Sequence, residues 1–248
     1  MITRRALFVA GAGGLVTGCD ALGNSPSFRA LLKSGEDANY GLHRMLVDRT
    51  ALAKEFAASE RSPIFRANGT RMPSGDAYAR HMATGFTDWQ MVIDGLVTRP
   101  QAIPLAQIRT MPARSQITRH DCVEGWSAIG KWTGVPLKYL LDQAGLTSQA
   151  KYIIFHCADP QSNGTMYYES VDMVDALHPQ TMLAWALNDA LLPVPNGAPL
   201  RLRVERQLGY KHAKYVQRIE AVASLDRHYG GKGGYWEDAA GYEWYAGA

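Results

Sequence analysis

The chain of 248 residues lacks most of the features that would place a sequence in a class at once. It has three cysteines, so each of them needs its own explanation. No run of five or more like charges occurs, no DNA- or RNA-binding motif is present, and a net charge of +3 is too small to indicate nucleic acid. Neither a fixed-period repeat nor a βαβ alternation is visible. What remains is a composition typical of a globular protein with one domain or two closely merged ones.

Residues 1–19 are predicted to be an export signal. Arg4 and Arg5 precede a weakly apolar stretch that is too short and too rich in glycine to span a bilayer as a stable helix. This pattern resembles a twin-arginine signal, which generally carries proteins already folded around a cofactor. The residues VTGC, which end at Cys19, resemble a lipoprotein box, and a plain signal cut elsewhere is the alternative. We expect a periplasmic protein, with a lipid anchor if Cys19 is acylated.

Residues 20–47 are expected to be a linker, polar and irregular over 20–39, and residues 48–248 to form one α+β domain. Helices are predicted over 48–60, over 134–146, and from Ser170 to the residue before Pro179. The alternating or apolar runs predict strands over 88–97, 151–159, 181–193 with a turn at Asn188-Asp189, 198–206 and 213–224. The glycine-rich aromatic tail over 229–248 is expected to wrap the surface with its rings as anchors.

Cys122 lies in the stretch RHDCVEGW, among charged and aromatic residues, whereas a core cysteine normally lies in an apolar run. Its surroundings indicate a site. One alternative is a structural disulfide with Cys157, which would add about 3–4 kcal/mol of stability. A second is a zinc site made of His120, Cys122, His156 and Cys157, although the spacings H-x-C and H-C do not suit a tetrahedral ligand set.

Three polar segments, 65–70, 119–130 and 207–214, combine basic residues with Gly or Asn and are expected to be loops. Arginine forks and backbone N–H groups of this kind suit a large anionic ligand that contains phosphate. Solvated loop charge is the alternative for any single residue. The basic residues offered by these segments and by the strand predicted over 198–206 are Arg66, Arg119, Arg201, Arg206, Lys211, His212 and Lys214.

Four stretches, ITRHDCVEGWSAIGKWTGVPL, YIIFHCAD, YYESVDMVDALHPQTMLAWALN and NGAPLRLRVERQLGYKHAKYV, resemble the sulfite oxidase-like molybdenum enzymes. The bacterial branch that contains the catalytic subunit of the periplasmic methionine sulfoxide reductase is most similar in layout. The resemblance covers residues 62–222, and the motifs come in the family's order. It implies the sulfite oxidase-type molybdopterin-binding fold, with strand-rich mixed sheets, surrounding helices and long loops.

The resemblance implies that the Cys122 sulfur binds molybdenum, which one molybdopterin also holds, and a soft thiolate suits that metal. Arg119 and His120 would favour the thiolate by their charge. Cys157 lies near a further contact position of the family; a buried small hydrophobe is the alternative. Glu124, Tyr167 and Tyr168 are additional pocket candidates. The implied cofactor contacts are Asn68, Arg66, Asn196, Arg201, His212, Ala213 and Lys214.

The resemblance also implies oxygen-atom transfer on a small-molecule or protein-bound sulfur substrate. The sequence NGAP stands where eukaryotic sulfite oxidases have HGAP or HGFP, which indicates the bacterial branch. No C-x-x-C-H haem motif is present, so electrons are expected to pass through a separate cytochrome or membrane haem protein. The competing hypothesis is a metal-free exported lipoprotein that serves as a binding or scaffold module, with a Cys122–Cys157 disulfide.

Overall fold

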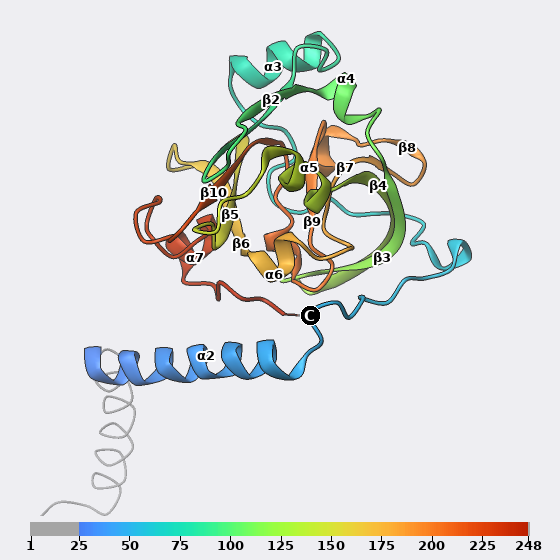
Figure 1. Ribbon diagram of the computed structural model, residues 1–248. Coiled ribbons are helices and arrows are strands. Elements are labelled where there is room, and N and C mark those ends of the chain that lie inside the picture. The colour runs from blue at the N-terminus through green and yellow to red at the C-terminus, as the bar shows by residue number, and fades with distance from the viewer. Residues whose placement is uncertain (1–24, 248) are drawn as a thin grey trace, which may run out of the picture. The chain divides into compact units, whose positions relative to one another are not determined.

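A computed structural model describes residues 25–247, which divide into two units (Figure 1). The first unit ends at Arg49 and the second runs from Thr50 to the C-terminus. The predicted export signal, including Cys19, lies outside the described residues. Among residues 25–247, no helix is long and apolar enough to cross a membrane.

The first unit contains helix α2 (Pro26–Leu46), so the prediction of irregular structure is wrong for residues 26–39. Pro26 occupies the first helical turn, and the leucine, lysine, arginine and alanine residues that follow are good helix formers. They outweigh the two glycines, Gly35 and Gly41, in the same helix. No residue of α2 is buried.

The helix predicted over residues 48–60 is also wrong, because most of this segment is extended. Glu55 forms an antiparallel bridge with Thr118, and the Phe56 N–H donates to the Ile117 carbonyl at 2.9 Å. The Gln180 side chain binds both backbone groups of Ala53, at 2.8 and 3.0 Å. Pairing with an edge strand therefore overrides the local helix propensity, and only the 3-10 turn η1 (Ala58–Glu60) remains.

Two five-stranded sheets form the second unit. The first has the order β2-β1-β10-β5-β6, with β1 (Gln90–Gly95) and β10 (Val216–Val222) parallel and the other neighbours antiparallel. Its remaining strands are β2 (Gln101–Pro104), β5 (Tyr152–Pro160) and β6 (Met166–Asp172). The strands predicted around residues 88–97, 151–159 and 213–224 are thus confirmed.

The second sheet is antiparallel, with the order β3-β4-β7-β8, and β9 also pairs with β7. Its strands are β3 (Arg114–Cys122), β4 (Trp126–Pro136), β7 (Met182–Leu187), β8 (Ala190–Leu191) and β9 (Arg201–Arg203). The predicted turn at Asn188-Asp189 is confirmed, and both residues have the positive φ that a tight two-residue hairpin requires. The expected loop over 119–130 is instead the tip of the β3–β4 hairpin, because β3 alternates in burial up to Cys122.

Helix α5 (Leu137–Ala144) joins the two sheets, since it contacts β1 of the first and β4 and β7 of the second (Figure 1). Leu137, Leu140, Leu141 and Ala144 form its buried stripe, and Gly145 ends the helix in the left-handed region, as predicted. The main hydrophobic core runs along this contact. Further helices are α3 (Asp76–Ala83), α4 (Leu105–Ile108), α6 (Met173–Ala176) and α7 (Tyr235–Ala240), with 3-10 turns η2 (Val194–Asn196) and η3 (Gly209–Lys211).

Helix α6 is shorter than predicted, and Ser170 does not cap it. The Asp172 carboxylate accepts the hydrogen bond of the Asp175 N–H and begins the helix two residues later. Ser170 belongs to β6, where its hydroxyl donates to the Gly233 carbonyl. Residues of β6 thus tie the C-terminal segment to the first sheet.

Candidate active site

Cys122 is the last residue of β3 and opens the tight turn into β4. The Gly125 N–H donates to the Cys122 carbonyl at 3.0 Å, and Gly125 has a φ of 82°, which favours glycine. The Cys122 side chain is 9% exposed and its thiol is free. The Cys157 thiol is free as well, so the structure contradicts the disulfide of the competing hypothesis.

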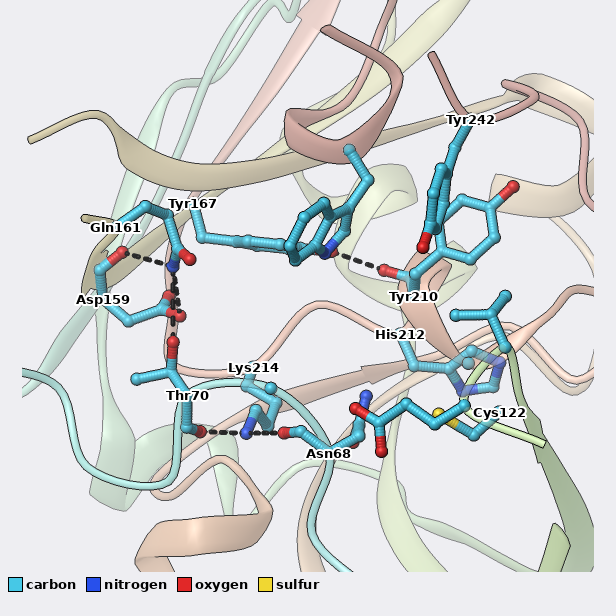
Figure 2. Close-up of a pocket in the computed structure, with 15 residues that line it drawn as sticks. Asn68, Thr70, Cys122, Asp159, Gln161, Tyr167, Tyr210, His212, Lys214 and Tyr242 are labelled. Carbon is cyan, nitrogen blue, oxygen red and sulfur yellow. Dashed lines mark hydrogen bonds between the residues drawn. The ribbon is translucent and has the colours of Figure 1, made fainter. Parts of the chain in front are cut away.

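Cys122 lines a pocket of about 190 Å³ that brings together residues distant in the sequence (Figure 2). Asn68, His212 and Lys214, three of the predicted cofactor contacts, line the same pocket. Figure 2 shows Cys122 beside His212 at one end and Asp159 with Gln161 at the other. The full lining is Asn68, Gly69, Thr70, Cys122, Val123, Glu124, Asp159, Gln161, Tyr167, Gly209, Tyr210, His212, Lys214, Trp236 and Tyr242.

Arg201 is fully buried next to this pocket, at the start of β9. Its guanidinium donates to the Asn68 side-chain oxygen and to the Asn196 carbonyl, both at 3.1 Å. Burial, with Arg203 nearby, lowers its pKa to about 9. Arg201 therefore joins Asn68 and Asn196, which lie 128 residues apart in the chain, into one polar cluster.

Lys214 also binds the segment that contains Asn68. Its ammonium group donates to the carbonyls of Asn68, Thr70 and Pro195. Burial, followed by repulsion from Arg201, lowers its pKa to about 7. A bound anion would raise this pKa again, because an opposite charge favours the protonated amine.

Two histidine rings meet edge to face beneath Cys122, with 5.0 Å between the centroids of His120 and His212. Burial and the nearby arginines hold the pKa of both rings well below the usual value, so both are neutral. His212 contacts the Gln207 carbonyl through Nε2 at 3.0 Å. Its Nδ1 atom is buried and has no hydrogen-bond partner among the described residues.

These residues fit an anionic, hydrogen-bonding group. Within residues 25–247, Asn196 Nδ2, Arg201 Nε and His212 Nδ1 are buried without a partner, although buried polar atoms are normally paired. Two buried cations, Arg201 and Lys214, stand near them with no carboxylate bonded to either in the described part of the chain. Because His212 is neutral and its Nε2–H donates to the Gln207 carbonyl, its Nδ1 is an acceptor. A ligand with a phosphate, ring acceptors and an N–H donor would satisfy all of these groups.

Other predicted contacts lie elsewhere. Arg66 is exposed on the Asn68 loop. Ala213 is buried between His212 and Lys214, and its carbonyl accepts from the Leu202 N–H at 2.8 Å. Cys157 belongs to the hydrophobic core on β5 and does not line the pocket, in agreement with the buried-hydrophobe alternative.

The expected help of Arg119 and His120 to the Cys122 thiolate is not found. The Arg119 side chain is 57% exposed and pairs with Asp121 at 2.9 Å, while His120 is neutral. Burial raises the pKa of the Cys122 thiol, and the Glu124 carboxylate adds to the rise. Arg201 is the cation that opposes this shift.

Lys211 and Arg206, the other two basic residues singled out in the sequence, pair with carboxylates of the protein. Lys211 is fully buried between Glu169 and Glu237, and Arg206 pairs with Asp175 at 2.8 Å. Of the seven basic residues singled out in the sequence, Arg201, His212 and Lys214 converge on the pocket.

Several lining residues could not be recognised from the sequence. Asp159 ends the predicted strand 151–159, and burial raises its pKa to about 7. Trp236 and Tyr242 come from the tail that was expected to wrap the surface. Tyr167, one of the additional candidates, does line the pocket, whereas Tyr168 is buried in a separate cluster with Tyr235.

Comparison with known proteins places most residues of this pocket within a characterised domain type. The model of the oxidoreductase molybdopterin binding domain matches residues 79–229. A protein of Azospira oryzae, described as a candidate protein-methionine-sulfoxide reductase subunit and named YedZ1, is 37% identical over 234 residues. The match covers 94% of this chain and 82% of that protein.

The protein-methionine-sulfoxide reductase catalytic subunit MsrP of Xanthomonas campestris is 37% identical over 147 residues. This match covers 55% of the chain but 46% of MsrP, so the chain matches less than half of that relative's length. Among solved structures, the sulfane dehydrogenase SoxCD of Paracoccus pantotrophus is similar, with a TM-score of 0.51 at 23% identity. That likeness covers 56% of this chain and 39% of the SoxCD chain, and it supports the fold.

Proposed function

Because the chain belongs to the family of oxidoreductases with a molybdopterin-binding domain, we propose that it is an exported reductase that removes the oxygen atom from a sulfoxide. The family confirms the predicted α+β fold and the predicted oxidoreductase class, and its members use the molybdenum–molybdopterin cofactor. The balanced reaction consumes two protons and two electrons and converts a sulfoxide into a sulfide and water.

One observation carries this proposal: the free Cys122 thiol lines the same pocket as His212 and Lys214, and Asn68 of that pocket binds the buried Arg201, whose Nε has no partner among the described residues. A thiol alone would suit many sites. A thiol next to Arg201, Lys214 and the orphaned Asn196 and His212 nitrogens suits a metal carried by a phosphate-bearing organic ligand.

In this reading the chain's residues bind and orient the cofactor. The Cys122 sulfur is the protein ligand of the metal, and it must lose its proton when the metal binds, which offsets the raised pKa. Arg201 Nε and Asn196 Nδ2, which have no partner among the described residues, would donate to the organic part of the cofactor, and Lys214 would neutralise its charge. When bound, the molybdenum cofactor supplies the two-electron exchange of an oxygen atom with sulfur.

The residues around the mouth favour a neutral substrate. Glu124 is exposed in the pocket lining, so a dianion such as sulfite would meet its carboxylate as well as aromatic faces. A sulfoxide carries no net charge. The names of YedZ1 and MsrP, which refer to protein-methionine-sulfoxide reductases, support the same substrate class.

We place the enzyme in the periplasm, exported in folded form through the Arg4-Arg5 signal, with Cys19 as a candidate lipid anchor. Electrons would come from a separate cytochrome or membrane haem protein. The reason is that no C-x-x-C-H sequence is present in the chain.

The test is turnover of protein purified from cells that make molybdopterin, assayed with a reduced viologen dye. N-acetylmethionine sulfoxide, dimethyl sulfoxide and trimethylamine N-oxide are offered as oxidants, and sulfite with ferricyanide tests the reverse direction. We expect sulfoxide reduction that is lost in Cys122→Ser. Efficient sulfite oxidation without sulfoxide reduction would contradict the proposal.

A further inference from the structure

The C-terminal segment forms one wall of the pocket, although it lies beyond the region matched by the family model, which ends at residue 229. Trp236, on α7, and Tyr242, just after it, both line the pocket. Figure 2 shows the Tyr242 and Tyr210 rings close together above His212. The pocket therefore combines residues of the family domain, among them Cys122, His212 and Lys214, with two aromatic residues from the segment that follows it.

The rings of this wall contact one another in a fixed arrangement. Trp236 and Tyr242 stack, with 5.7 Å between centroids and 25° between planes. Tyr242 also meets Tyr210 edge to face at 5.1 Å. Tyr210 and Tyr167 continue the wall, because the Tyr167 hydroxyl donates to the Tyr210 carbonyl at 2.7 Å.

Buried charges tie the segment to the family domain. The Lys211 ammonium donates to Glu237 at 2.7 Å and to Glu169, and all three side chains are at most 1% exposed. Glu237 directly follows Trp236 on α7. A buried ion pair with little freedom holds the neighbouring indole in one place.

Backbone contacts hold the far end of the segment. The Leu208 N–H donates to the Ala246 carbonyl at 2.8 Å, and Gln207 forms a bridge with Gly247. The Tyr210 hydroxyl donates to the Glu243 carbonyl at 2.5 Å. Tyr242 lies between these anchors and is still 38% exposed, so its ring is available to a ligand.

The chemistry of the wall selects by charge and shape. Aromatic faces carry negative electrostatic potential and make favourable contacts with sulfur and with methyl groups. The Glu124 carboxylate adds negative charge to the lining of the pocket. A dialkyl sulfoxide, which is neutral and carries carbon groups on sulfur, suits these surfaces better than an oxyanion.

We propose that Trp236 and Tyr242 are the specificity-determining residues of this enzyme and form the site for the alkyl groups of a dialkyl sulfoxide. This inference rests on the proposed function. It assigns the discrimination between neutral and anionic substrates to the C-terminal segment and leaves cofactor binding to the family domain.

The experiment compares cofactor-loaded wild type with Trp236→Ala and Tyr242→Ala. Tyr229→Ala is the matched control, because Tyr229 is a similarly exposed tyrosine (47%) that does not line the pocket. Steady-state kinetics with N-acetylmethionine sulfoxide are combined with calorimetric titration of dimethyl sulfone, a neutral analogue used without an electron donor. Molybdenum content is measured for every variant.

We expect KM and the Kd for the sulfone to rise at least fivefold in both pocket variants. The kcat should stay within about threefold, the molybdenum content should be unchanged, and the control should match wild type. Wild-type sulfoxide turnover with KM and Kd unchanged in the variants would overturn the inference and leave the proposed function standing. A fully loaded wild type that reduces no sulfoxide would overturn both.

Discussion

Asp159 is the residue whose environment differs most from what its sequence position suggests. It is the second-last residue of β5, it is 3% exposed, and its Oδ1 atom has no partner among the described residues. Burial raises the pKa of this carboxyl to about 7. It lines the pocket together with Lys214, whose pKa falls to about 7, so the charge of the pocket changes near neutral pH.

We predict that Asp159→Asn makes the cofactor-free protein less sensitive to alkaline pH. The wild-type carboxyl is protonated in the folded state but ionised in the unfolded state between pH 3.8 and about 7, so its contribution to stability is lost as the pH rises through that window. The variant should match wild type near pH 4 and exceed it by about 1–3 kcal/mol at pH 8. Urea unfolding at the two pH values measures this. If the substitution changed the free energy of unfolding equally at pH 4 and pH 8, burial would not be what raises the pKa of the Asp159 carboxyl.

Single residues also show how much of the candidate site could be predicted from the sequence. Cys122 stood out because charged residues surround it, and motif resemblance identified Asn68, His212 and Lys214, which the fold brings into one pocket. Arg119 and Lys211 looked equally suitable, but one pairs at the surface with Asp121 and the other is buried with two glutamates. Sequence alone does not show which cations have carboxylate partners in space.

At the level of elements, local patterns predicted strands well and failed where tertiary contacts decide. The runs that became β5, β7 and β10 are apolar or alternating, and α5 is bounded by Pro136 and Gly145. The segment 48–60 has helix-forming residues but pairs with the edge strand β3, and α2 forms in a stretch interrupted by glycines. Neither outcome is encoded in a window of ten residues.

The Lys211 cluster is the element-scale contact that joins α7 to the rest of the fold. We predict that Lys211→Met destabilises the protein by about 3–5 kcal/mol at pH 8, because Glu169 and Glu237 would face each other without a cation. The pKa of Glu169 is already raised by burial and by Glu237, so the variant's folded state retains protons and its deficit should shrink toward pH 5.

Urea unfolding at pH 5 and pH 8 tests this expectation. Lys138→Met is the control, because Lys138 pairs with Asp142 on the surface and its loss should cost about 0.5 kcal/mol or less. If the two variants had the same stability at pH 8, the buried cluster would contribute nothing to the attachment of α7.

At the level of the whole molecule, the described chain consists of one helix in the first unit and a two-sheet second unit that carries the site. No residue of α2 is buried. We predict that a chain beginning at Thr50 keeps the secondary structure of the second unit, as measured by far-UV circular dichroism. Its Tm should lie within about 2 °C of the Tm of the full chain. A fall in Tm of more than about 5 °C, which corresponds to roughly 2 kcal/mol for a chain of this size, would show that residues 1–49 stabilise the second unit.

The central claim is that the Cys122 sulfur is bonded to a molybdenum atom held in this pocket. The most direct test is X-ray absorption at the molybdenum edge, with metal analysis, on wild type and Cys122→Ser produced in molybdopterin-competent cells. The account predicts about one molybdenum per wild-type chain, and a variant that either loses the metal or retains it with one fewer sulfur neighbour. Full metal content with an unchanged number of sulfur neighbours in Cys122→Ser would contradict it.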